Sequence, residues 1–320
     1  MKKVLIVLVV FMMASMSVSA AEVFSSDDAS LSIGGRLKTA GGYDGEDYVW
    51  EDQGSRITIE GTRTIADGIF AFATYELGFD PLSPGTGFGQ RLGYLGVDIN
   101  GHVISAGQQW SLWDDLAGLA DFTEVTGGIA IRNDRTVGGS RSKGMSYRGD
   151  FDVVEVATQI QYENGDNDWS AGATVGTSLG ALNLLAGVQY ASVEAGKLDS
   201  DGMHVGFENA TLVGLAAEYK VLDNLTLAAA GAFEMYDSQY RVSQETGVKV
   251  TLDANGSSLF AGNNFAYDLE QGEIDTNFIT VGGTYNILPG SSFYMFAEAK
   301  FDVEDVKEDS EFWVGARYSF

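Results

Sequence analysis

Alternation of apolar with polar or small residues, repeated along the whole chain, is the feature that most constrains this sequence. From Ile69 to Phe79, every second residue is apolar, and the intervening positions include Thr74 and Glu76. Successive side chains of a β-strand point to opposite faces, so this period of two predicts strands with one apolar face. The same pattern recurs in further segments: Ser55–Arg63, Leu225–Tyr236 and Phe293–Val303.

A soluble antiparallel sandwich also alternates, but two features favour a transmembrane barrel. Many segments run ten residues or more, whereas soluble strands usually have about 5–6 residues and a tilted membrane strand needs about 9–11. Short and long connections also alternate, as they do in barrels. The predicted short turns are Ala66–Gly68, Asn100–His102, Asp150–Asp152, Asp223–Asn224 and Leu288–Gly290. The predicted longer loops are Gly41–Gly54, Asp80–Gly89, Ala195–Gly206 and Asp237–Gly247.

The predicted fold class is therefore all-β, a closed transmembrane antiparallel barrel over residues 21–320. Closure pairs every backbone group, which hydrocarbon requires. Eleven strands are predicted up to Tyr236 and three more after Asp275, but the region from Asp237 to Gly272 has two interpretations. One long loop there gives fourteen strands, whereas two strands near Val248–Asp253 and Ser258–Asp268 give sixteen.

The N-terminus resembles an export signal. Lys2 and Lys3 precede an apolar run, and small residues ending at Ala20 form a cleavage site, so residues 1–20 are predicted to be a signal peptide. Loss of the two lysines would move the net charge from −26 to −28. This acidity excludes nucleic acid as a partner and is compatible with acidic outer loops beside lipopolysaccharide and outer-membrane lipid. The chain has no cysteine, so it has neither disulfides nor thiolate sites.

Four segments resemble the general porins of Gram-negative bacteria, as found in gamma-proteobacteria. Leu31–Lys38 is similar to the first strand of that family, and Ser55–Gly61 is similar to the second. The last strand, from Glu311 to Phe320, ends in an aromatic residue, like the C-terminal signal of outer-membrane barrels. The stretch from Arg91 to Gln109 is similar to a porin hairpin, with Gln108 where the family usually has arginine. The resemblance implies a homotrimer of sixteen-stranded barrels whose third external loop, Trp110–Ala130 here, folds into the lumen.

The resemblance also implies a pore constriction in which basic wall residues face acids on that loop. The wall residues would be Arg36, Arg56 and Arg91, with Arg135 or Arg141 as a fourth, and the loop acids would be Asp121 and Glu124. Alternation alone places Arg56 and Arg91 on the lumen side. The expected function is passive diffusion of small hydrophilic solutes and ions across the outer membrane, with a mild preference for cations.

Three alternatives remain open. A non-conducting adhesin or phage receptor would bind partners through the external loops, and this role could coexist with a pore. Lumen aromatics such as Phe70, Phe72, Tyr94 and Trp110 could form a sugar track in an oligosaccharide-selective porin. A barrel enzyme is disfavoured because the only histidines, His102 and His204, fall in predicted connections.

No cofactor or metal is expected, since Asp199, Asp201 and Glu208 lack the spacing of a calcium loop. The five tryptophans are assigned to interfacial girdles, except that packing or pore lining is preferred for Trp110 and Trp113.

Overall fold

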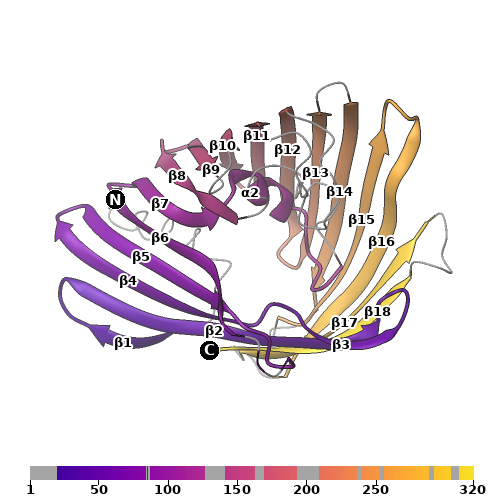
Figure 1. Ribbon diagram of the computed structural model, residues 1–320, viewed down its shortest axis with the longest axis horizontal. Helices are drawn as coiled ribbons and strands as arrows, with labels where there is room; N and C mark the ends of the chain where they lie inside the picture. The colour runs from indigo at the N-terminus through magenta and orange to yellow at the C-terminus, as the bar shows by residue number, and fades with distance from the viewer. Residues whose placement is uncertain are drawn as a thin grey trace.

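The chain forms a closed antiparallel β-barrel in the computed structural model (Figure 1). The structure describes residues 20–83, 85, 87–126, 141–162, 169–192, 209–236, 239–252, 256–287, 292–303 and 310–320. The predicted signal peptide, the turn Leu288–Gly290 and the loop Ala195–Gly206 therefore lie wholly or almost wholly outside the described residues. Within the described residues, no helix is long and apolar enough to cross a membrane.

All strands belong to one sheet. They are β1 (Ala21–Ser25), β2 (Ala29–Tyr43), β3 (Tyr48–Asp52), β4 (Arg56–Ala66), β5 (Ile69–Gly78), β6 (Gly89–Ile99), β7 (His102–Trp110), β8 (Arg141–Asp150), β9 (Glu155–Tyr162), β10 (Trp169–Leu179), β11 (Leu182–Ser192), β12 (Asn209–Leu222), β13 (Leu225–Tyr236), β14 (Gln239–Thr251), β15 (Ser258–Asp268), β16 (Glu273–Asn286), β17 (Phe293–Asp302) and β18 (Glu311–Ser319). One short helix, α2 (Leu112–Gly118), is described between β7 and β8.

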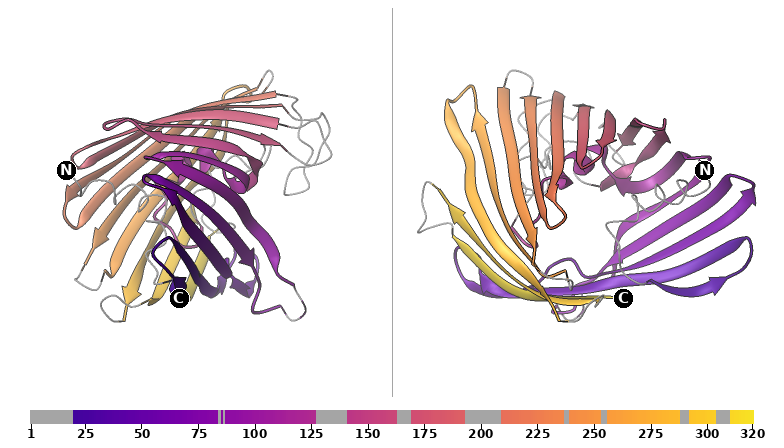
Figure 2. Two further views of the ribbon diagram at one scale, coloured as in Figure 1. Left: turned by 90° about the vertical axis from the view of Figure 1, so that its left-hand side faces the viewer. Right: turned by 180° about the vertical axis from the view of Figure 1, so that it is seen from behind.

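The barrel wall contains sixteen strands, which decides between the two predicted counts. Each wall strand pairs with its sequence neighbours, β18 pairs with β2, and β2 pairs with β4, so the ring closes. The short strands β1 and β3 lie beside the two ends of β2 and are additional to the ring. The strands are tilted within the wall, as Figure 2 shows from the side.

The predicted alternation is confirmed by burial. On β13, Leu227 and Phe233 are exposed on the outer surface, whereas Ala228, Ala230 and Glu234 are buried on the lumen side. On β17, Met295 is exposed and Glu298 is buried. Tight turns join strands at the end opposite the constriction loop. Asn100 and Gly101 both have positive φ (54° and 87°), as a two-residue hairpin of this handedness requires.

Two predicted loops are wrong in extent. Gly41–Gly54 contains the end of β2 and all of β3, because backbone pairing extends beyond the apolar part of the strands. Asp237–Gly247 is mostly strand β14, which begins at Gln239. The prediction failed there because polar residues occupy both faces of β14: Ser243 and Glu245 are buried in the lumen, and Gln244 is exposed outside.

Candidate functional site: the lumen constriction

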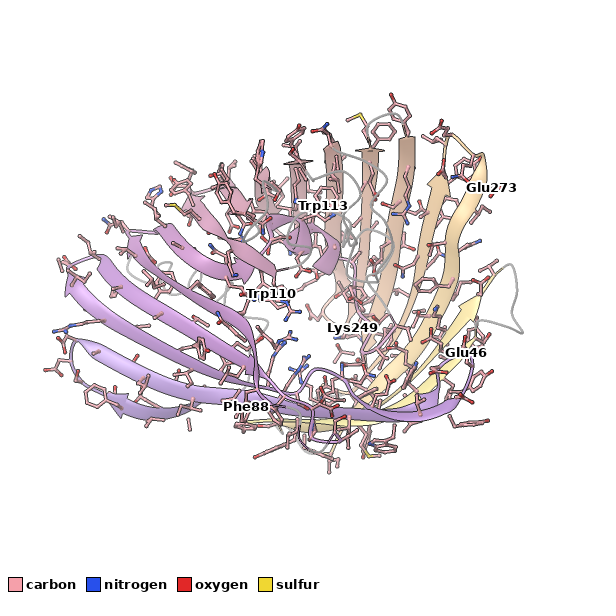
Figure 3. All side chains as sticks on the ribbon, viewed as in Figure 1. Glu46, Phe88, Trp110, Trp113, Lys249 and Glu273 are labelled. Atoms are coloured by element: carbon pink, nitrogen blue, oxygen red, sulfur yellow. The ribbon has the colours of Figure 1, made fainter. Side chains whose placement is uncertain are left out.

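The third external loop enters the barrel and packs on its inner wall. Ser111 caps α2 by accepting a hydrogen bond from the Asp114 backbone N–H at 3.1 Å. The helix then buries Trp113, Leu116 and Ala117 against the wall. Figure 1 shows α2 inside the ring, and Trp110 and Trp113 lie there as well (Figure 3).

Small residues on the lumen side of the wall make room for this helix and for the loop that follows it. The part of the wall that α2 packs against is rich in alanine, including Ala210, Ala228 and Ala230. At Gly214, an added Cβ would lie 2.9 Å from Leu116 and 3.0 Å from Trp113. At Gly247, it would lie 2.7 Å from the Ala120 carbonyl oxygen. The loop therefore approaches the strands more closely than a larger side chain would permit.

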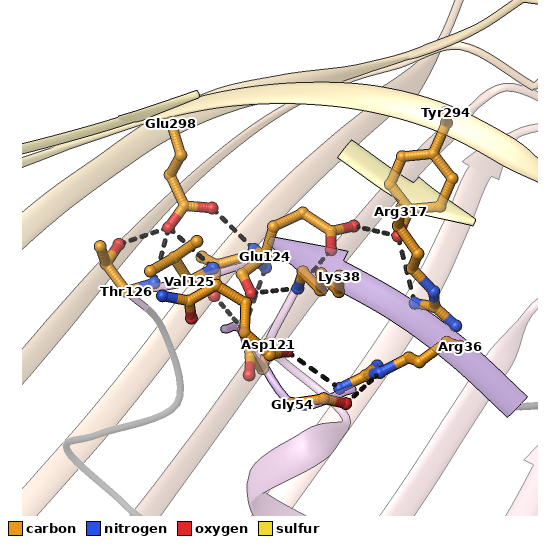
Figure 4. Close-up of polar contacts among 12 residues, drawn as sticks. Arg36, Lys38, Gly54, Asp121, Glu124, Val125, Thr126, Tyr294, Glu298 and Arg317 are labelled. Atoms are coloured by element: carbon orange, nitrogen blue, oxygen red, sulfur yellow. Dashed lines mark hydrogen bonds and ion pairs between the residues drawn. The ribbon is translucent and has the colours of Figure 1, made fainter. Parts of the chain in front are cut away.

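A buried carboxylate fixes the loop beyond the helix. Glu298 of β17 is 1% exposed and accepts hydrogen bonds from the backbone N–H groups of Glu124, Val125 and Thr126 at 2.6, 3.2 and 2.6 Å. The Thr126 hydroxyl donates to the same carboxylate at 2.6 Å. Charge-assisted hydrogen bonds of this kind are stronger than neutral ones, so Glu298 holds three consecutive loop residues on the wall (Figure 4).

Three of the predicted basic residues lie together on the lumen side of the wall, on strands β2, β4 and β6, and β5 separates the last two of these. Arg36 of β2 is directly paired in register with Arg56 of β4, and Arg91 of β6 lies over Gly78 of β5. An added Cβ at Gly78 would lie 2.8 Å from the Arg91 Cδ, so the glycine leaves space for this side chain. Arg36 donates to the Gly54 carbonyl oxygen at 2.9 Å.

The route by which Arg91 reaches the lumen differs from the predicted one. Leu92 is paired with Glu76 and is buried, so it takes the inward position on β6. The register shifts between this pair and the next, and Arg91 is the extra residue of that bulge. The bulge turns Arg91 toward Glu76, whereas simple alternation with Leu92 would direct it outward.

Glu76 is not among the predicted site residues, but it lies between two of the arginines. Its Oε1 is 2.8 Å from Arg91 Nε and its Oε2 is 3.2 Å from Arg56 Nε. The Thr58 hydroxyl also donates to Glu76 at 3.2 Å. Because Glu76 is only 2% exposed, its charge acts mainly on these two guanidinium groups.

Two further cations were missed. Lys38 of β2, which is 4% exposed, forms an ion pair of 2.7 Å with Glu124. Arg317 of β18 donates to the Tyr294 hydroxyl at 3.1 Å, and that hydroxyl donates to Glu124 at 2.9 Å. Period-two alternation contained the signal for both residues, because Lys38 shares a face with Arg36 and Arg317 lies opposite the outward residues of its strand.

Of the predicted loop acids, Glu124 is bound directly to the wall. Burial opposes its ionisation, but the charge of Lys38 and the hydrogen bonds from Lys38 and Tyr294 outweigh burial and lower the pKa of Glu124 below its usual value. Asp121 accepts hydrogen bonds from the Thr123 hydroxyl and backbone N–H at 2.6 and 3.0 Å. Together with Arg36 and Arg317, both acids line a polar pocket of about 270 Å³ (Figure 4).

The remaining predicted residues are dispersed. Arg141 lies over the Trp110 ring at 5.3 Å, and Arg135 and His204 fall outside the described residues. Gln108 donates to the Arg91 carbonyl oxygen at 2.9 Å. Trp313 is 3% exposed and packs in the lumen-side wall, so its assignment to an interfacial girdle is wrong. Across the described ranges, no three His, Asp or Glu side chains are grouped as metal ligands.

Comparisons with known proteins agree with this architecture. A family profile described as Gram-negative porin matches residues 5–320. Outer membrane protein U of Vibrio vulnificus (strain CMCP6) is 28% identical over 255 residues, which are 75% of this chain and 70% of that protein.

Solved structures share the fold at lower sequence identity. In-vitro folded OmpT of Vibrio cholerae, in its trimer form, has a TM-score of 0.75 and 17% identity, covering 92% of this chain and all of that one. An anion-selective porin from Comamonas acidovorans has a TM-score of 0.77 and 14% identity, with 92% of this chain and 100% of that chain covered. At these identities the likeness concerns the fold alone, so ion preference must be argued from side chains.

Proposed function

Because the chain belongs to the Gram-negative porin family, which consists of outer-membrane channels and not of enzymes, we propose that it passes small hydrophilic solutes by diffusion and mildly prefers cations. The constriction that sets this preference is formed by the wall residues Arg36, Arg56 and Arg91 and the loop acids Asp121 and Glu124. Arg135, which the porin resemblance gives as a candidate fourth wall residue, is proposed as a further member.

The observation that carries the cation preference is the position of Glu76. A lone arginine cluster in a narrow aqueous gap would attract anions and repel cations. Here the Glu76 carboxylate lies within 3.2 Å of both Arg56 and Arg91, so it offsets much of their positive potential. Glu124 likewise offsets Lys38. The wall is then less basic than its arginine content indicates, while the chain as a whole carries a charge of −26.

Gln108 supports the same direction. The general-porin hairpin that this segment resembles has arginine at this position, and here the neutral glutamine hydrogen-bonds to the Arg91 backbone. This segment therefore carries one positive charge fewer than the hairpin that it resembles. Polar and charged lumen groups still favour hydrated solutes over apolar ones, because an apolar solute gains no hydrogen bonds when it enters the constriction.

Reversal potentials measured in planar bilayers under a KCl gradient test the proposal. We expect the potential to have the sign of a potassium-preferring channel, and a chloride-preferring sign would contradict the assignment. Liposome swelling with a graded series of neutral sugars then gives the size limit. Swelling that falls smoothly with solute size supports diffusion through an open constriction, and no swelling with any solute would refute it.

We also propose that the chain is exported by residues 1–20 and assembles as a homotrimer. Support for the assembly comes from the family and from OmpT of Vibrio cholerae, whose solved form is described as a trimer. The intact mass of the mature protein should be that of a chain beginning at Ala21. Native mass spectrometry in detergent should give the mass of an assembly of three chains. A mature monomer beginning at Met1 would contradict both proposals.

An oligosaccharide-selective pore is the second candidate, and a specific contact favours it. Phe72 and Tyr94 lie edge to face on the lumen side, with ring centroids 6.3 Å apart. Aromatic faces of this kind can bind the apolar faces of sugar rings. Concentration-dependent blockade of single-channel current by a maltose series would select this candidate, and simple size-dependent diffusion would select the first.

A further inference from the structure

A carboxylate and two aromatic rings lie together on the lumen wall, next to the arginine residues of the constriction. Glu60 of β4, Thr74 of β5 and Tyr94 of β6 are paired in register across three adjacent strands. Phe72 lies two residues further from the constriction loop on β5, where it is paired with Gly96. We refer to Glu60, Phe72 and Tyr94 as the ring–carboxylate set.

All three side chains of the set face the lumen. Thr58 and Glu76 are both 2% exposed and meet on the lumen side, where the Thr58 hydroxyl donates to Glu76 at 3.2 Å. Glu60 lies two residues after Thr58, and Phe72 lies four residues before Glu76, so alternation places both on this face. Register partners share a face of the sheet, so Tyr94 faces the lumen as well. The three side chains are half-buried, and water in the pore can reach them.

The two rings gather on one side of Glu60. The Phe72 ring lies over Gly96, because a Cβ added there would be 2.5 Å from the Phe72 Cζ. It meets the Tyr94 ring edge to face, with ring centroids 6.3 Å apart and ring planes at 78°. Only the short side chain of Thr74 separates the rings from Glu60 along this row, and the charge of Glu60 acts on the Tyr94 hydroxyl. A carboxylate and an aromatic pair therefore lie side by side around one small residue.

Elsewhere in the lumen, two lysine ammonium groups are each held by a carboxylate and an aromatic ring. Each ammonium nitrogen is 2.7 Å from a carboxylate oxygen and either 5.2 or 4.9 Å from a ring centroid. The two arrangements are Lys38 with Glu124 and Phe296, and Lys300 with Glu311 and Phe278. An aromatic face attracts a cation through its quadrupole, and the carboxylate adds a charge-assisted hydrogen bond. This combination therefore serves as an ammonium holder in this lumen.

The ring–carboxylate set has the same components, but the described chain supplies no cation to it. Within the described ranges, Glu60 has no hydrogen bond or ion pair, and no lysine or arginine lies over the ring of Phe72 or Tyr94. Glu76 differs, because its charge is shared by two arginines. The charge of Glu60 is consequently available to a cation that enters from the pore.

We propose that the ring–carboxylate set binds small solutes that carry an alkylammonium group. The ammonium would contact Glu60, and its alkyl part would lie against Phe72 and Tyr94, as a lysine side chain does at the other two places. The proposal rests on the proposed pore, because solutes reach the set through it. It is separate from the Glu76 ion pairs that carry the potassium preference, because an alkyl group and an aromatic ring are needed for it.

Blockade of single-channel current tests the site in the full mature chain. The probe is n-butylammonium, which is the lysine side chain as a free solute, and n-butanol is the neutral control of similar size. We expect butylammonium added to a KCl bath to reduce the current in a concentration-dependent and saturable way, whereas butanol should not. A reduction no larger than that caused by butanol would overturn the proposal.

A matched pair of carboxylate variants locates the blockade. Glu60→Gln should raise the half-blocking concentration of butylammonium about fivefold, because it removes the charge and keeps the shape of the side chain. The control is Glu218→Gln on the lumen side of β12, where the register partners are Asn183 and Ala228 and not aromatic residues. This control should block like the wild type. An equal effect of both substitutions would indicate a general charge effect and refute a site at Glu60.

Variants of the ring provide an independent test, which also applies if Glu60→Gln does not fold, as judged by the heat-dependent mobility of the barrel. Phe72→Leu should raise the half-blocking concentration about threefold, and Phe72→Tyr should restore it, because it keeps an aromatic face. Unchanged blockade in Phe72→Leu would overturn the proposal.

The same recordings separate this site from the proposed function. A barrel that conducts KCl normally but is blocked equally by butylammonium and by maltose would assign the two rings to sugars. That result would overturn the alkylammonium site and leave diffusion through the pore intact. A barrel that passes no KCl current would refute the pore, and the site with it.

Discussion

At the scale of single residues, the charge of the constriction depends on which carboxylate lies next to which cation. Arg56 and Arg91 share Glu76, Lys38 is paired with Glu124, and Tyr294 connects Glu124 to Arg317. Removing one partner of a buried pair leaves the other charge uncompensated, so its effect on passing ions becomes larger. Both carboxylates can therefore be tested by electrical recording.

Glu76→Gln should shift the reversal potential toward chloride. One carboxylate charge about 10 Å from an ion in water contributes roughly 0.4 kcal/mol, favourable to potassium and unfavourable to chloride, so the potassium-to-chloride permeability ratio should change by about fourfold. Glu60→Gln is the matched control, because Glu60 lies on the same wall without an arginine partner among the described residues. If both variants shift the potential equally, the pairing of Glu76 with the arginines is not what sets selectivity.

The Lys38–Glu124 ion pair should persist in acid. Because the folded-state pKa of Glu124 lies below its usual value near 4.5, the pair is fully present above pH 4.5 and is lost only as the pH falls through the lowered pKa. The pair attaches the constriction loop to the wall, so its loss should make the loop less fixed and the single-channel current noisier. Single-channel recordings should therefore show no increase in current noise until the pH is below about 4.5. Noise that rises between pH 6 and 5 in the wild type, but not in Glu124→Gln, would contradict this sign.

At the scale of elements, the constriction exists because the loop after β7 is bound at several points to strands that are distant in sequence. The capped helix α2 packs on the alanine-rich wall, and Asp115 forms an ion pair of 2.6 Å with Arg148 of β8. Glu298 of β17 binds the backbone of residues 124–126. The loop is thus held from both sides of the lumen, and each attachment can be weakened separately.

Gly247→Val should displace the loop and enlarge the pore. The added side chain would overlap the Ala120 carbonyl and the Phe122 ring, at a cost of about 1–3 kcal/mol typical of overpacking. Single-channel conductance should rise. The control is Gly231→Val on the outer surface of β13. Its Cβ would lie 3.6 Å from the nearest atom, the Ser243 carbonyl oxygen, so this variant should conduct like the wild type. Equal conductance of all three proteins would show that the glycine is not needed for loop position.

At the scale of the whole molecule, a closed ring of sixteen strands separates an apolar exterior from a polar lumen. Exposed outward residues such as Leu95, Leu215 and Ile104 meet lipid, whereas Glu76, Gln159 and Thr280 are buried inside. Closure leaves no unpaired edge in hydrocarbon. The same side-chain substitution should therefore have different effects on the two surfaces.

Leu215→Arg should destabilise the barrel in bilayers, by about 2–4 kcal/mol if the residue lies near the membrane midplane. Thr62→Arg places the same charge on the lumen side and should change the free energy of unfolding much less. Urea titration of both variants in lipid vesicles measures the difference. A similar loss of stability in both would indicate that Leu215 does not face hydrocarbon.

The sequence by itself determined the class of fold and the facing of most wall residues, because alternation is a local property of each strand. It therefore predicted eleven strands up to Tyr236, the outward face of the last strand, and the lumen position of Arg56. It did not decide between fourteen and sixteen strands, because polar residues on both faces of β14 obscure the alternation. It also left Glu76, Lys38 and Arg317 unassigned, although period-two alternation places all three on the lumen face of their strands.

Only the tertiary structure decided how charges are paired. The Glu76 contacts require the register of β4, β5 and β6 and a bulge at Arg91, and the Glu298 contacts join residues more than 170 positions apart in the sequence. Hydrogen bonds and ion pairs act over a few ångströms in space, and no spacing along the chain encodes which strands closure will bring side by side. For that reason the barrel could be predicted from the sequence, whereas its constriction required the structure.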